Sequence, residues 1–599
     1  MAENKIPVRS EVPEEYTWNT ADIYPSDEAW QAECDALRAC PARISAFAGT
    51  LGESAAKLLA FLQLDDELSQ RIGRLYGYAM LKSDEDVGNS FYQDMRGKAM
   101  GVAVAVSSAS AFMTPEVMAI DDEKLEGFYK AEPKLETYRR VLYGIRRRKA
   151  HILSSEGETL LASAQEMAES PETVGSILRN AELRFPEVVD GQGVSHPLTN
   201  GSLTVLLESA DADFRRRVFE TYYDRLGEYK NTIAATLDGQ FKQLRFFAGA
   251  RKYENTLSAA LDANEVPVEV YHNLIQAVHD NMDKMYRYVA LRKRLLGVES
   301  LHMYDVYTPI VPDAAQKISF EQAKENVLEA LAVLGEDYLD MLREGFANRW
   351  IDVYENVGKR SGAYSAGDSC PHPYVLLNHK DNLDSQFTLV HEMGHALHSY
   401  LSNKNQPICT REYVIFVAEV ASTCNEVLLM RHLLAKTTDR RERAYLINHF
   451  LDQFKGTIYR QTMFAEFELM MGRMSEEGQT LTADALCEKY KALNALYFGP
   501  DMVNDEGIAL EWARIPHFFY NYYVFQYATG FSAAVAIASR ILEKGESAVA
   551  DYKRFLSSGS STDPISLLKI AGVDMSTPEP VNAALKLFGE LLDEMETLV

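Results

Sequence analysis

Long runs in which apolar residues recur three to four positions apart restrict this chain to a helical fold. Two such runs are AAKLLAFLQLDDELSQRIGRLYGYAMLKS, beginning at Ala55, and RRRVFETYYDRLGEYKNTIAATLDGQFKQLRFFAGARK, beginning at Arg215. Neither run contains proline. This spacing is typical of amphipathic α-helices that bury one face. The sequence therefore predicts a mainly α fold.

Two segments interrupt the helical pattern. Residues 184–209 combine proline, glycine and asparagine with short β-branched runs, which predicts a small hairpin and a lobe boundary near residue 200. We expect an N-terminal helical lobe at 1–200 and a second domain at 201–599. The other segment, 351–382, contains extended candidates around Gly362 to Ser365 and Tyr374 to Leu377.

The composition argues against several classes of function. A formal net charge of −26 over 599 residues repels a phosphate backbone, so we expect no nucleic acid partner. The segment MAENKIPVRSEVPEEY lacks the apolar core of a signal peptide, and MGVAVAVSSASAFM is too short and too serine-rich to span a bilayer. Six cysteines without a CxxC pair fit reduced thiols. We therefore expect a cytoplasmic protein without a membrane partner.

The segment DSQFTLVHEMGHALHSYL carries the motif HExxH on a helical pattern. We expect a helix near 385–402, capped by Asp384 or Ser385, that presents His391 and His395 on one face. Two imidazoles at this spacing can reach one metal ion. Zinc fits, because it accepts imidazole nitrogen and carboxylate oxygen in a near-tetrahedral arrangement that leaves one position for water.

Such a site needs a third protein ligand. Glu419 is the preferred candidate, because an unpaired carboxylate would be costly in the apolar segment REYVIFVAEVASTCNEVLLMRHLL. His398 is the alternative metal ligand, but residues seven apart start about 10 Å from each other along a helix axis. We therefore expect His398 behind the ligands or facing a substrate. Glu426 is either an orienting partner for a ligand imidazole or an ordinary packing residue.

Two further features bear on chemistry. Glu392 follows the first histidine directly, which turns its carboxylate away from the row of metal ligands. This position suits a general base that takes a proton from water and passes it to a leaving amine. Farther along, the segment RIPHFFYNYYVFQYATGFSAA surrounds His517 with tyrosines. That cluster is either apolar core or a source of hydroxyls for an oxyanion.

The chain resembles the oligoendopeptidase F branch of the thimet-oligopeptidase-like zinc peptidases over most of its length. The resemblance is carried, in this order, by YTWNTADIYPSDEAW, LSSEGETLLASAQEM, GKRSGAYS, HEMGHALHS, FVAEVASTCNE and IPHFFYNYYVFQYATG. It implies a two-lobed helical ellipsoid with a deep substrate channel and a small β-sheet near the active site. One zinc ion per chain is also implied.

The resemblance assigns roles to single residues. It implies that His391, His395 and Glu419 bind zinc and that Glu392 is the general base. Some descriptions of the family motif count His398 as a metal site, so it stays the alternate ligand.

For the tetrahedral intermediate, the resemblance implies stabilisation by His517 and a nearby tyrosine. Four tyrosines lie close together in this segment. Tyr523 and Tyr527 are favoured, with Tyr522 behind them.

The sequence thus predicts a zinc-dependent endopeptidase that hydrolyses internal peptide bonds of short unfolded oligopeptides. An extended substrate would pair with the strand near Gly362 to Ser365 by β-addition. One alternative is a carboxypeptidase or dipeptidyl carboxypeptidase on the same zinc site. Another is a metal-free helical protein that binds peptides without cutting them. Oligomeric state is not predicted.

Overall fold

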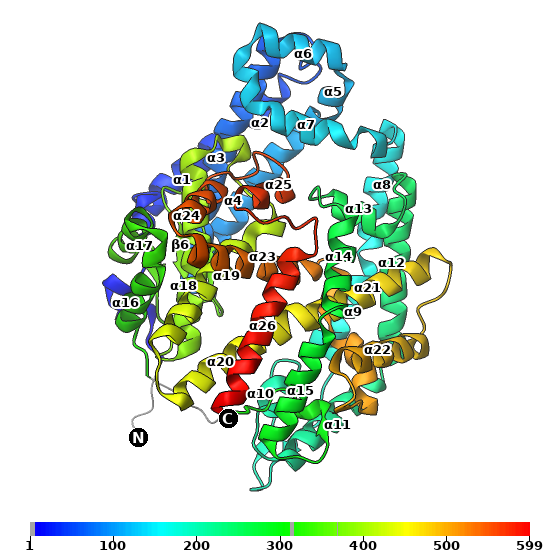
Figure 1. Ribbon diagram of the computed structural model, residues 1–599. Helices are drawn as coiled ribbons and strands as arrows, with labels where there is room; N and C mark the ends of the chain where they lie inside the picture. Colours follow the sequence, from blue (N-terminus) through cyan, green and yellow to red (C-terminus); the bar gives the residue numbers. More distant parts are fainter. Residues whose placement is uncertain (1–5, 312–316, 368) are drawn as a thin grey trace. The chain divides into compact units, whose positions relative to one another are not determined.

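The computed structural model describes residues 6–311, 317–367 and 369–599, and helices predominate in it (Figure 1). The first long apolar run forms α3 (Ala55–Glu85) as a single helix. The second forms α11 (Ala212–Gly227) and α12 (Lys230–Ala250), which are separated by a short break. The prediction of a mainly α fold is confirmed.

The chain folds into two compact units that alternate along the sequence. Unit 1 comprises Met1–Lys149, Ala315–Leu429 and Ile537–Gly572, and unit 2 comprises Ala150–Ala314, Met430–Ala536 and Val573–Val599. This division by contacts differs from the predicted lobes at 1–200 and 201–599, which stay a prediction. It differs because residues far apart in sequence complete each unit.

The N-terminal helices of unit 1 enclose an apolar core whose buried members lie between Trp30 and Leu142. The Trp30 indole N–H donates to the Leu75 carbonyl oxygen at 2.8 Å. Besides α3, the helices of unit 1 are α1 (Asp27–Arg38), α2 (Pro41–Ser45), α4 (Ser90–Ala109), α5 (Met113–Ala119), α6 (Asp122–Ala131), α7 (Arg139–Arg147), α16 (Phe320–Ala330), α17 (Glu336–Ala347), α18 (Leu383–Asn405), α24 (Glu546–Leu556) and α25 (Pro564–Ile570).

Two further helices cross from one unit to the other along the chain. They are α19 (Ile415–Lys436) and α23 (Phe525–Lys544). Besides α11 and α12, the helices of unit 2 are α8 (Ser155–Ala168), α9 (Ser170–Ile177), α10 (Leu203–Leu207), α13 (Thr256–Asp262), α14 (Val268–His279), α15 (Met282–Leu296), α20 (Arg440–Phe454), α21 (Arg460–Glu476), α22 (Ala483–Phe498) and α26 (Glu579–Leu598).

A three-stranded sheet in unit 1 has the order β4-β6-β5. Strand β4 (Ile351–Asp352) runs parallel to β6 (Tyr374–Leu376), and β5 (Tyr364–Ala366) pairs with β6 in the antiparallel direction. Both predicted extended segments therefore form strands. Because β5 pairs with β6 on one side only, it is an edge strand of this sheet.

The segment that leads into β5 is anchored by a buried ion pair. Lys359 lies 2.7 Å from Asp352, and neither side chain has exposed surface. The same ammonium group donates to the Tyr354 carbonyl oxygen at 2.7 Å. These bonds tie the turn before β5 to strand β4, and they satisfy charges that would otherwise be costly to bury.

Two smaller sheets lie in unit 2. The predicted hairpin is present as β1 (Val188–Val189) and β2 (Ser195–His196), which are antiparallel. Strands β3 (Leu301–His302) and β7 (Met502–Val503) pair in the parallel direction.

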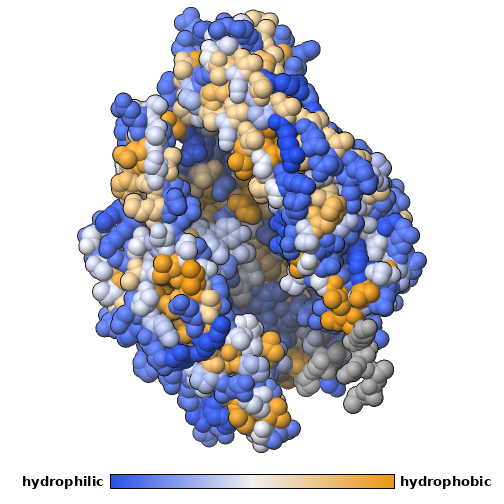
Figure 2. All heavy atoms as spheres, turned by 180° about the vertical axis from the view of Figure 1, so that it is seen from behind, coloured by the Kyte–Doolittle hydropathy of each residue, from blue (hydrophilic) through white to orange (hydrophobic). Residues whose placement is uncertain are grey.

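The hydropathy of the surface and of one apolar stretch can be compared with the prediction that the protein has no membrane partner. On the face shown in Figure 2, hydrophilic side chains predominate and apolar ones form separate groups. Among the described residues, the stretch Ser90–Ala119 is long and apolar enough to cross a membrane by length and composition, and 17% of its apolar window is buried. It comprises two helices, α4 and α5. The expected absence of a membrane span stays a prediction.

Candidate active site

The HExxH motif lies on α18, which begins directly after the small sheet. The N-cap is Asn382, whose side-chain oxygen accepts from the Ser385 backbone N–H at 2.9 Å. The predicted cap at Asp384 or Ser385 was wrong by two or three positions. In the segment NLDS, Asn382, Asp384 and Ser385 all have side chains that can cap a helix. Asn382 is the N-cap because the helix begins at the next residue.

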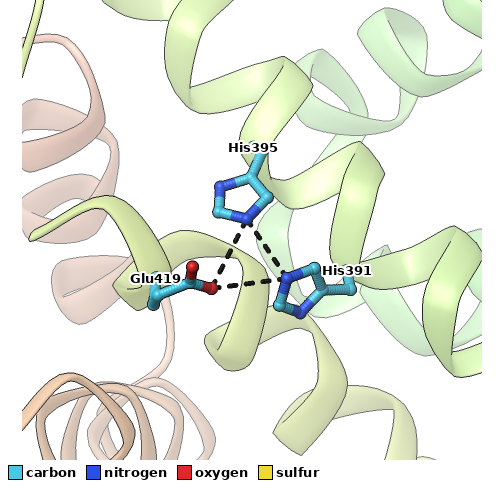
Figure 3. Close-up of side chains that lie close together, drawn as sticks. All are labelled: His391, His395 and Glu419. Atoms are coloured by element: carbon cyan, nitrogen blue, oxygen red, sulfur yellow. Dashed lines mark hydrogen bonds and ion pairs between the residues drawn. The ribbon is translucent and has the colours of Figure 1, made fainter. Parts of the chain in front are cut away.

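His391, His395 and Glu419 converge in unit 1 (Figure 3). Both histidines project from α18, and Glu419 projects from the first turns of α19. The two imidazole Nε2 atoms lie 3.1 Å apart. The Glu419 Oε2 atom lies 3.4 Å from His391 Nε2 and 3.5 Å from His395 Nε2.

This triangle has the dimensions of a zinc site. Ligands at 2.0–2.1 Å from a tetrahedral ion lie about 3.3 Å from one another. The three separations, 3.1, 3.4 and 3.5 Å, bracket that value. Two imidazole nitrogens and one carboxylate oxygen are also the donors that zinc accepts at catalytic sites. The residues therefore fit one zinc ion.

Glu426 contacts His391 at the ring nitrogen that does not face His395 and Glu419. His391 Nδ1–H donates to Glu426 Oε1 at 2.5 Å, which leaves Nε2 of the same ring directed toward His395 and Glu419. The orienting role considered for Glu426 is therefore confirmed as a contact. Carboxylates in this position fix the tautomer and raise the basicity of a ligand imidazole.

The electrostatics of the cluster favour positive charge. Burial alone would lower the pKa of His391, but hydrogen bonds to Glu419 and Glu426 raise it to about 10. Hydrogen bonds from His391 and His395 hold the pKa of Glu419 well below its usual range. The surrounding carboxylates thus stabilise a cation at this position, and a divalent metal ion would gain from the same arrangement.

Close contact between α18 and α19 sets the distance between the histidines and Glu419. Gly394 lies inside the motif, and a Cβ placed on it would lie 2.5 Å from the Cα of Ser422 and 2.9 Å from the Ala421 carbonyl oxygen. Glycine is the residue that permits this approach of two backbones.

Glu392 is buried, with 6% of its surface exposed, yet it lines the cavity at the cluster. Its Oε2 atom has no hydrogen-bond partner among the described residues. Burial raises the pKa of Glu392, which the adjacent histidines counteract. A carboxylate with a raised pKa and an unused oxygen is suited to accept a proton.

His398 does not join the metal cluster. Its ring is buried and stacks on Tyr413, with centroids 3.7 Å apart and an interplanar angle of 2°. Burial lowers the pKa of His398 to about 3, so the ring is neutral. The group that could hold a metal ion among the described residues consists of His391, His395 and Glu419. The structure gives no support to His398 as the alternate ligand.

A cavity of about 510 Å³ opens at the cluster within unit 1. The edge strand β5 contributes Tyr364 and Ser365 to its wall, and the helix α18 contributes Ser399 one turn beyond His395. Tyr413 also lines the cavity, and its hydroxyl lies 2.9 Å from the Ser399 hydroxyl. A metal cluster beside an unpaired strand edge can hold an extended chain across the reacting atoms.

The predicted oxyanion residues lie together in unit 2. Tyr527 OH and His517 Nε2 are 3.4 Å apart, and the rings of Tyr523 and Tyr527 meet edge to face at 5.3 Å. Burial lowers the pKa of His517, so the ring is neutral near pH 7. Tyr522 is different, because 2% of its surface is exposed and it belongs to the core.

Several residues around these sites were not predicted from the sequence. Tyr413 and Ser399 belong to no recognisable sequence motif, although Tyr413 lies in the same apolar segment as Glu419. Glu468 on α21 is fully buried beside Tyr522. A glutamate inside the apolar pattern QTMFAEFELMMG was the available signal for it.

Comparisons with known proteins extend over the whole chain. A family model described as Peptidase family M3 matches residues 205–587, and one described as Oligopeptidase F matches residues 116–185. Oligopeptidase PepF of Bacillus subtilis (strain 168) is 47% identical over 596 residues, which are 100% of this chain and 89% of that protein.

Solved structures agree with these matches. A crystal structure from Chlamydophila abortus has a TM-score of 0.93 and 33% identity, and the match covers 99% of this chain and 100% of that chain. The crystal structure of oligoendopeptidase-F from Enterococcus faecium has a TM-score of 0.74 and 37% identity, and the match covers 96% and 99% of the two chains.

Proposed function

Because the chain belongs to peptidase family M3, in its oligoendopeptidase F branch, and is a metalloendopeptidase acting on oligopeptides, we propose that it is a zinc enzyme whose metal ligands and general base are those converging on α18 and α19. The observation that carries the proposal is the triangle of His391, His395 and Glu419, whose sides match the ligand separations of a tetrahedral zinc ion.

The chain's own residues would hold the metal through two neutral imidazoles and one carboxylate, with Glu426 accepting from His391. When bound, zinc supplies Lewis acidity, which polarises a carbonyl oxygen and lowers the pKa of water toward neutrality. Three protein ligands leave one position open for water or substrate.

Glu392 accepts the proton of the attacking water. Its unused Oε2 atom and its burial beside the histidines support this role. After the peptide carbonyl has become tetrahedral, the same carboxyl group donates that proton to the leaving amine nitrogen, and Glu392 returns to its starting state. The water oxygen has bonded to the carbonyl carbon, and the peptide C–N bond breaks. The second proton of the water leaves the new carboxylic acid for the amine, so the products are a carboxylate and an ammonium group.

His517 and Tyr523 or Tyr527 are proposed to donate hydrogen bonds to the developing oxyanion. The neutral imidazole and the two phenols each carry an N–H or O–H that can donate. Their proximity within unit 2 supports a shared role. Donors aimed at a charge that forms only in the transition state accelerate the chemical step rather than binding alone.

The substrate is proposed to be a short unfolded peptide that pairs with the edge strand β5. Main-chain pairing with Tyr364–Ala366 reads the peptide backbone, so it tolerates many side chains. We place the enzyme in the cytoplasm, which is a reducing compartment, because the sequence has six cysteines in 599 residues and no CxxC pair.

Digestion of a peptide library capped at both termini tests this proposal. Internal cuts that stop with a chelator and return with zinc are expected, and mass spectrometry reads the products. A matched library with free C-termini is digested in parallel, and cuts restricted to that library would instead identify a carboxypeptidase. An absence of cuts with any divalent metal would overturn the proposal.

A further inference from the structure

The loop between His517 and Tyr523 has an unusual backbone. Asn521 has φ of 57° and Tyr522 has φ of 61°, so two consecutive residues that are not glycine lie in the left-handed region. Side chains with a Cβ are disfavoured there, and successive residues in this conformation are rarer still. Such strain persists only where the surroundings hold it, and it concentrates at functional sites.

Glu468 holds one end of this loop. Its Oε1 atom accepts from the Tyr522 backbone N–H at 2.6 Å, and the carboxyl group is fully buried. The second oxygen, Oε2, has no hydrogen-bond partner among the described residues. Burial raises the pKa of Glu468 to about 8, so the carboxyl is neutral at pH 7. Burying an acid group is costly unless it is hydrogen-bonded, and the bond to the Tyr522 backbone is the contact that the structure gives Glu468.

The other end of the loop is held by Gln240 on α12. Its amide donates to the Phe519 carbonyl oxygen at 3.2 Å and to Asn521 Oδ1 at 2.9 Å. Gln240 is 2% exposed. Two buried side chains from separate helices therefore bind the two strained residues directly, Gln240 at Asn521 and Glu468 at Tyr522.

The side chain of Tyr522 adds a third attachment. Its hydroxyl lies 2.8 Å from Thr256 Oγ1. It also lies directly over Gly472, one helical turn beyond Glu468, where an added Cβ would meet the hydroxyl oxygen at 1.9 Å. The surface of α21 thus provides a side-chain acceptor for the Tyr522 backbone N–H and a space that fits the Tyr522 hydroxyl.

We infer that Glu468 is a positioning residue, which holds the strained Asn521–Tyr522 loop so that Tyr523 stands beside His517 in the geometry that oxyanion stabilisation requires. This inference rests on the proposed function. The anchor acts through the Tyr522 backbone, and Glu468 itself touches no substrate. A neutral carboxyl in this role can be replaced by a carboxamide of the same shape.

The test compares Glu468→Ala with Glu468→Gln on an internally quenched peptide capped at both ends. Glu468→Ala is expected to lower kcat at least tenfold with KM within twofold, and Glu468→Gln to keep kcat within threefold. Asn521→Gly in the Glu468→Ala background should raise kcat at least threefold, because glycine adopts the left-handed conformation without strain. If Glu468→Ala lowered kcat only by destabilising the fold, Asn521→Gly would not restore kcat.

Hydrogen exchange supplies a readout independent of activity. Peptides covering residues 517–527 should exchange faster in Glu468→Ala than in the wild type, while peptides covering α18 should not change. If Glu468→Ala does not fold, Gly472→Ala displaces the Tyr522 hydroxyl in a helix that alanine favours, and the same loss of kcat is expected.

The outcomes separate this inference from the proposed function. Normal kcat and unchanged exchange in a folded Glu468→Ala, with kcat lost in His517→Ala, overturn the inference alone. Normal kcat in both His517→Ala and Tyr523→Phe overturns the proposed oxyanion role and the inference with it.

Discussion

A Cβ on Gly394 would lie 2.5 Å from the Cα of Ser422, so α18, which carries His391 and His395, and α19, which carries Glu419, meet backbone to backbone. No side chain separates them at this point, and none can relax to make room. The crossing therefore fixes how far Glu419 stands from His391 and His395.

Gly394→Ala is expected to weaken zinc binding at least tenfold, because α18 and α19 must separate to admit the methyl group. Overpacking of this kind costs about 1–3 kcal/mol of folding stability. Competitive titration against a zinc chelator measures the affinity. Gly97→Ala is the matched control, since Gly97 is also helical and an added Cβ there meets no atom within 4 Å. Equal zinc affinity in both variants would contradict the argument.

Replacement of Glu392 by glutamine should separate metal binding from catalysis. The variant keeps the three ligands and is expected to bind one zinc ion per chain, but it loses the proton acceptor. A general base contributes about 10²–10⁴-fold, so kcat should fall by that factor. Metal analysis and turnover of a capped peptide are measured on the same sample. Normal turnover would show that Glu392 is not the general base.

The third ligand can be tested by a pair of substitutions. Glu419→Ala is expected to abolish stoichiometric zinc, because it removes one corner of the triangle. His398→Phe should retain zinc, because His398 stacks on Tyr413 and a phenyl ring preserves that contact. Zinc content after dialysis decides the matter. Loss of zinc from His398→Phe with retention in Glu419→Ala would reverse the two roles.

Glu426→Gln tests the support behind His391. A carboxamide accepts the Nδ1–H bond but carries no negative charge, so the imidazole becomes a weaker base. Partners of this kind contribute about 10–100-fold to metal affinity, and a loss at the lower end of that range is expected. Glu426→Ala should lose more, because the ring also loses its orientation. The same chelator titration measures both variants, and affinities equal to the wild type would show that the contact is inert.

The buried carboxyl of Glu468 is expected to make folding stability depend on pH. Burial raises the pKa of this carboxyl to about 8 in the folded protein, whereas an unfolded chain has a value of about 4.3. Between these values the folded state keeps a proton that the unfolded state has released. The contribution of Glu468 to stability therefore falls as pH rises through this interval and is constant above pH 8.

Glu468→Gln lacks that titration. Its free energy of unfolding relative to wild type should increase from pH 5 to pH 8, as measured by urea denaturation. Tyr271 and Tyr522 interact with Glu468, and the pKa of each is raised above 10, so neither titrates in this interval. Glu477→Gln, at the exposed end of α21, is the control and should show a flat difference. A flat difference for Glu468→Gln would mean that the acid is ionised when buried.

Local pattern was enough to predict the features that lie on one helix. The spacing of His391 and His395 requires only helical periodicity, and the cost of burying Glu419 in an apolar helix pointed to a cation partner. The N-cap was missed because adjacent Asn, Asp and Ser residues have similar capping ability. The rise along the helix predicts that His398 lies apart from the other ligands, but its stacking on Tyr413 depends on tertiary structure.

Features that join distant segments could not be predicted in this way. Glu468 meets Tyr522 across 54 positions of sequence, and no glycine marks the left-handed turn at Asn521. The strain is imposed by anchors on two other helices rather than by local preference, so it leaves no local signal.

The alternation of the two units along the chain also bears on how the protein is made. Unit 1 holds His391, His395 and Glu419, the proposed metal ligands, but is completed by Ile537–Gly572, and unit 2 is completed by Val573–Val599. A polypeptide leaves the ribosome from its N-terminus, and domains fold as units once their residues are available. His391 and Glu419 therefore emerge well before the helices that finish their surroundings. A ribosome that stalls before residue 537 releases a chain that carries the metal-binding motif without a complete unit to support it.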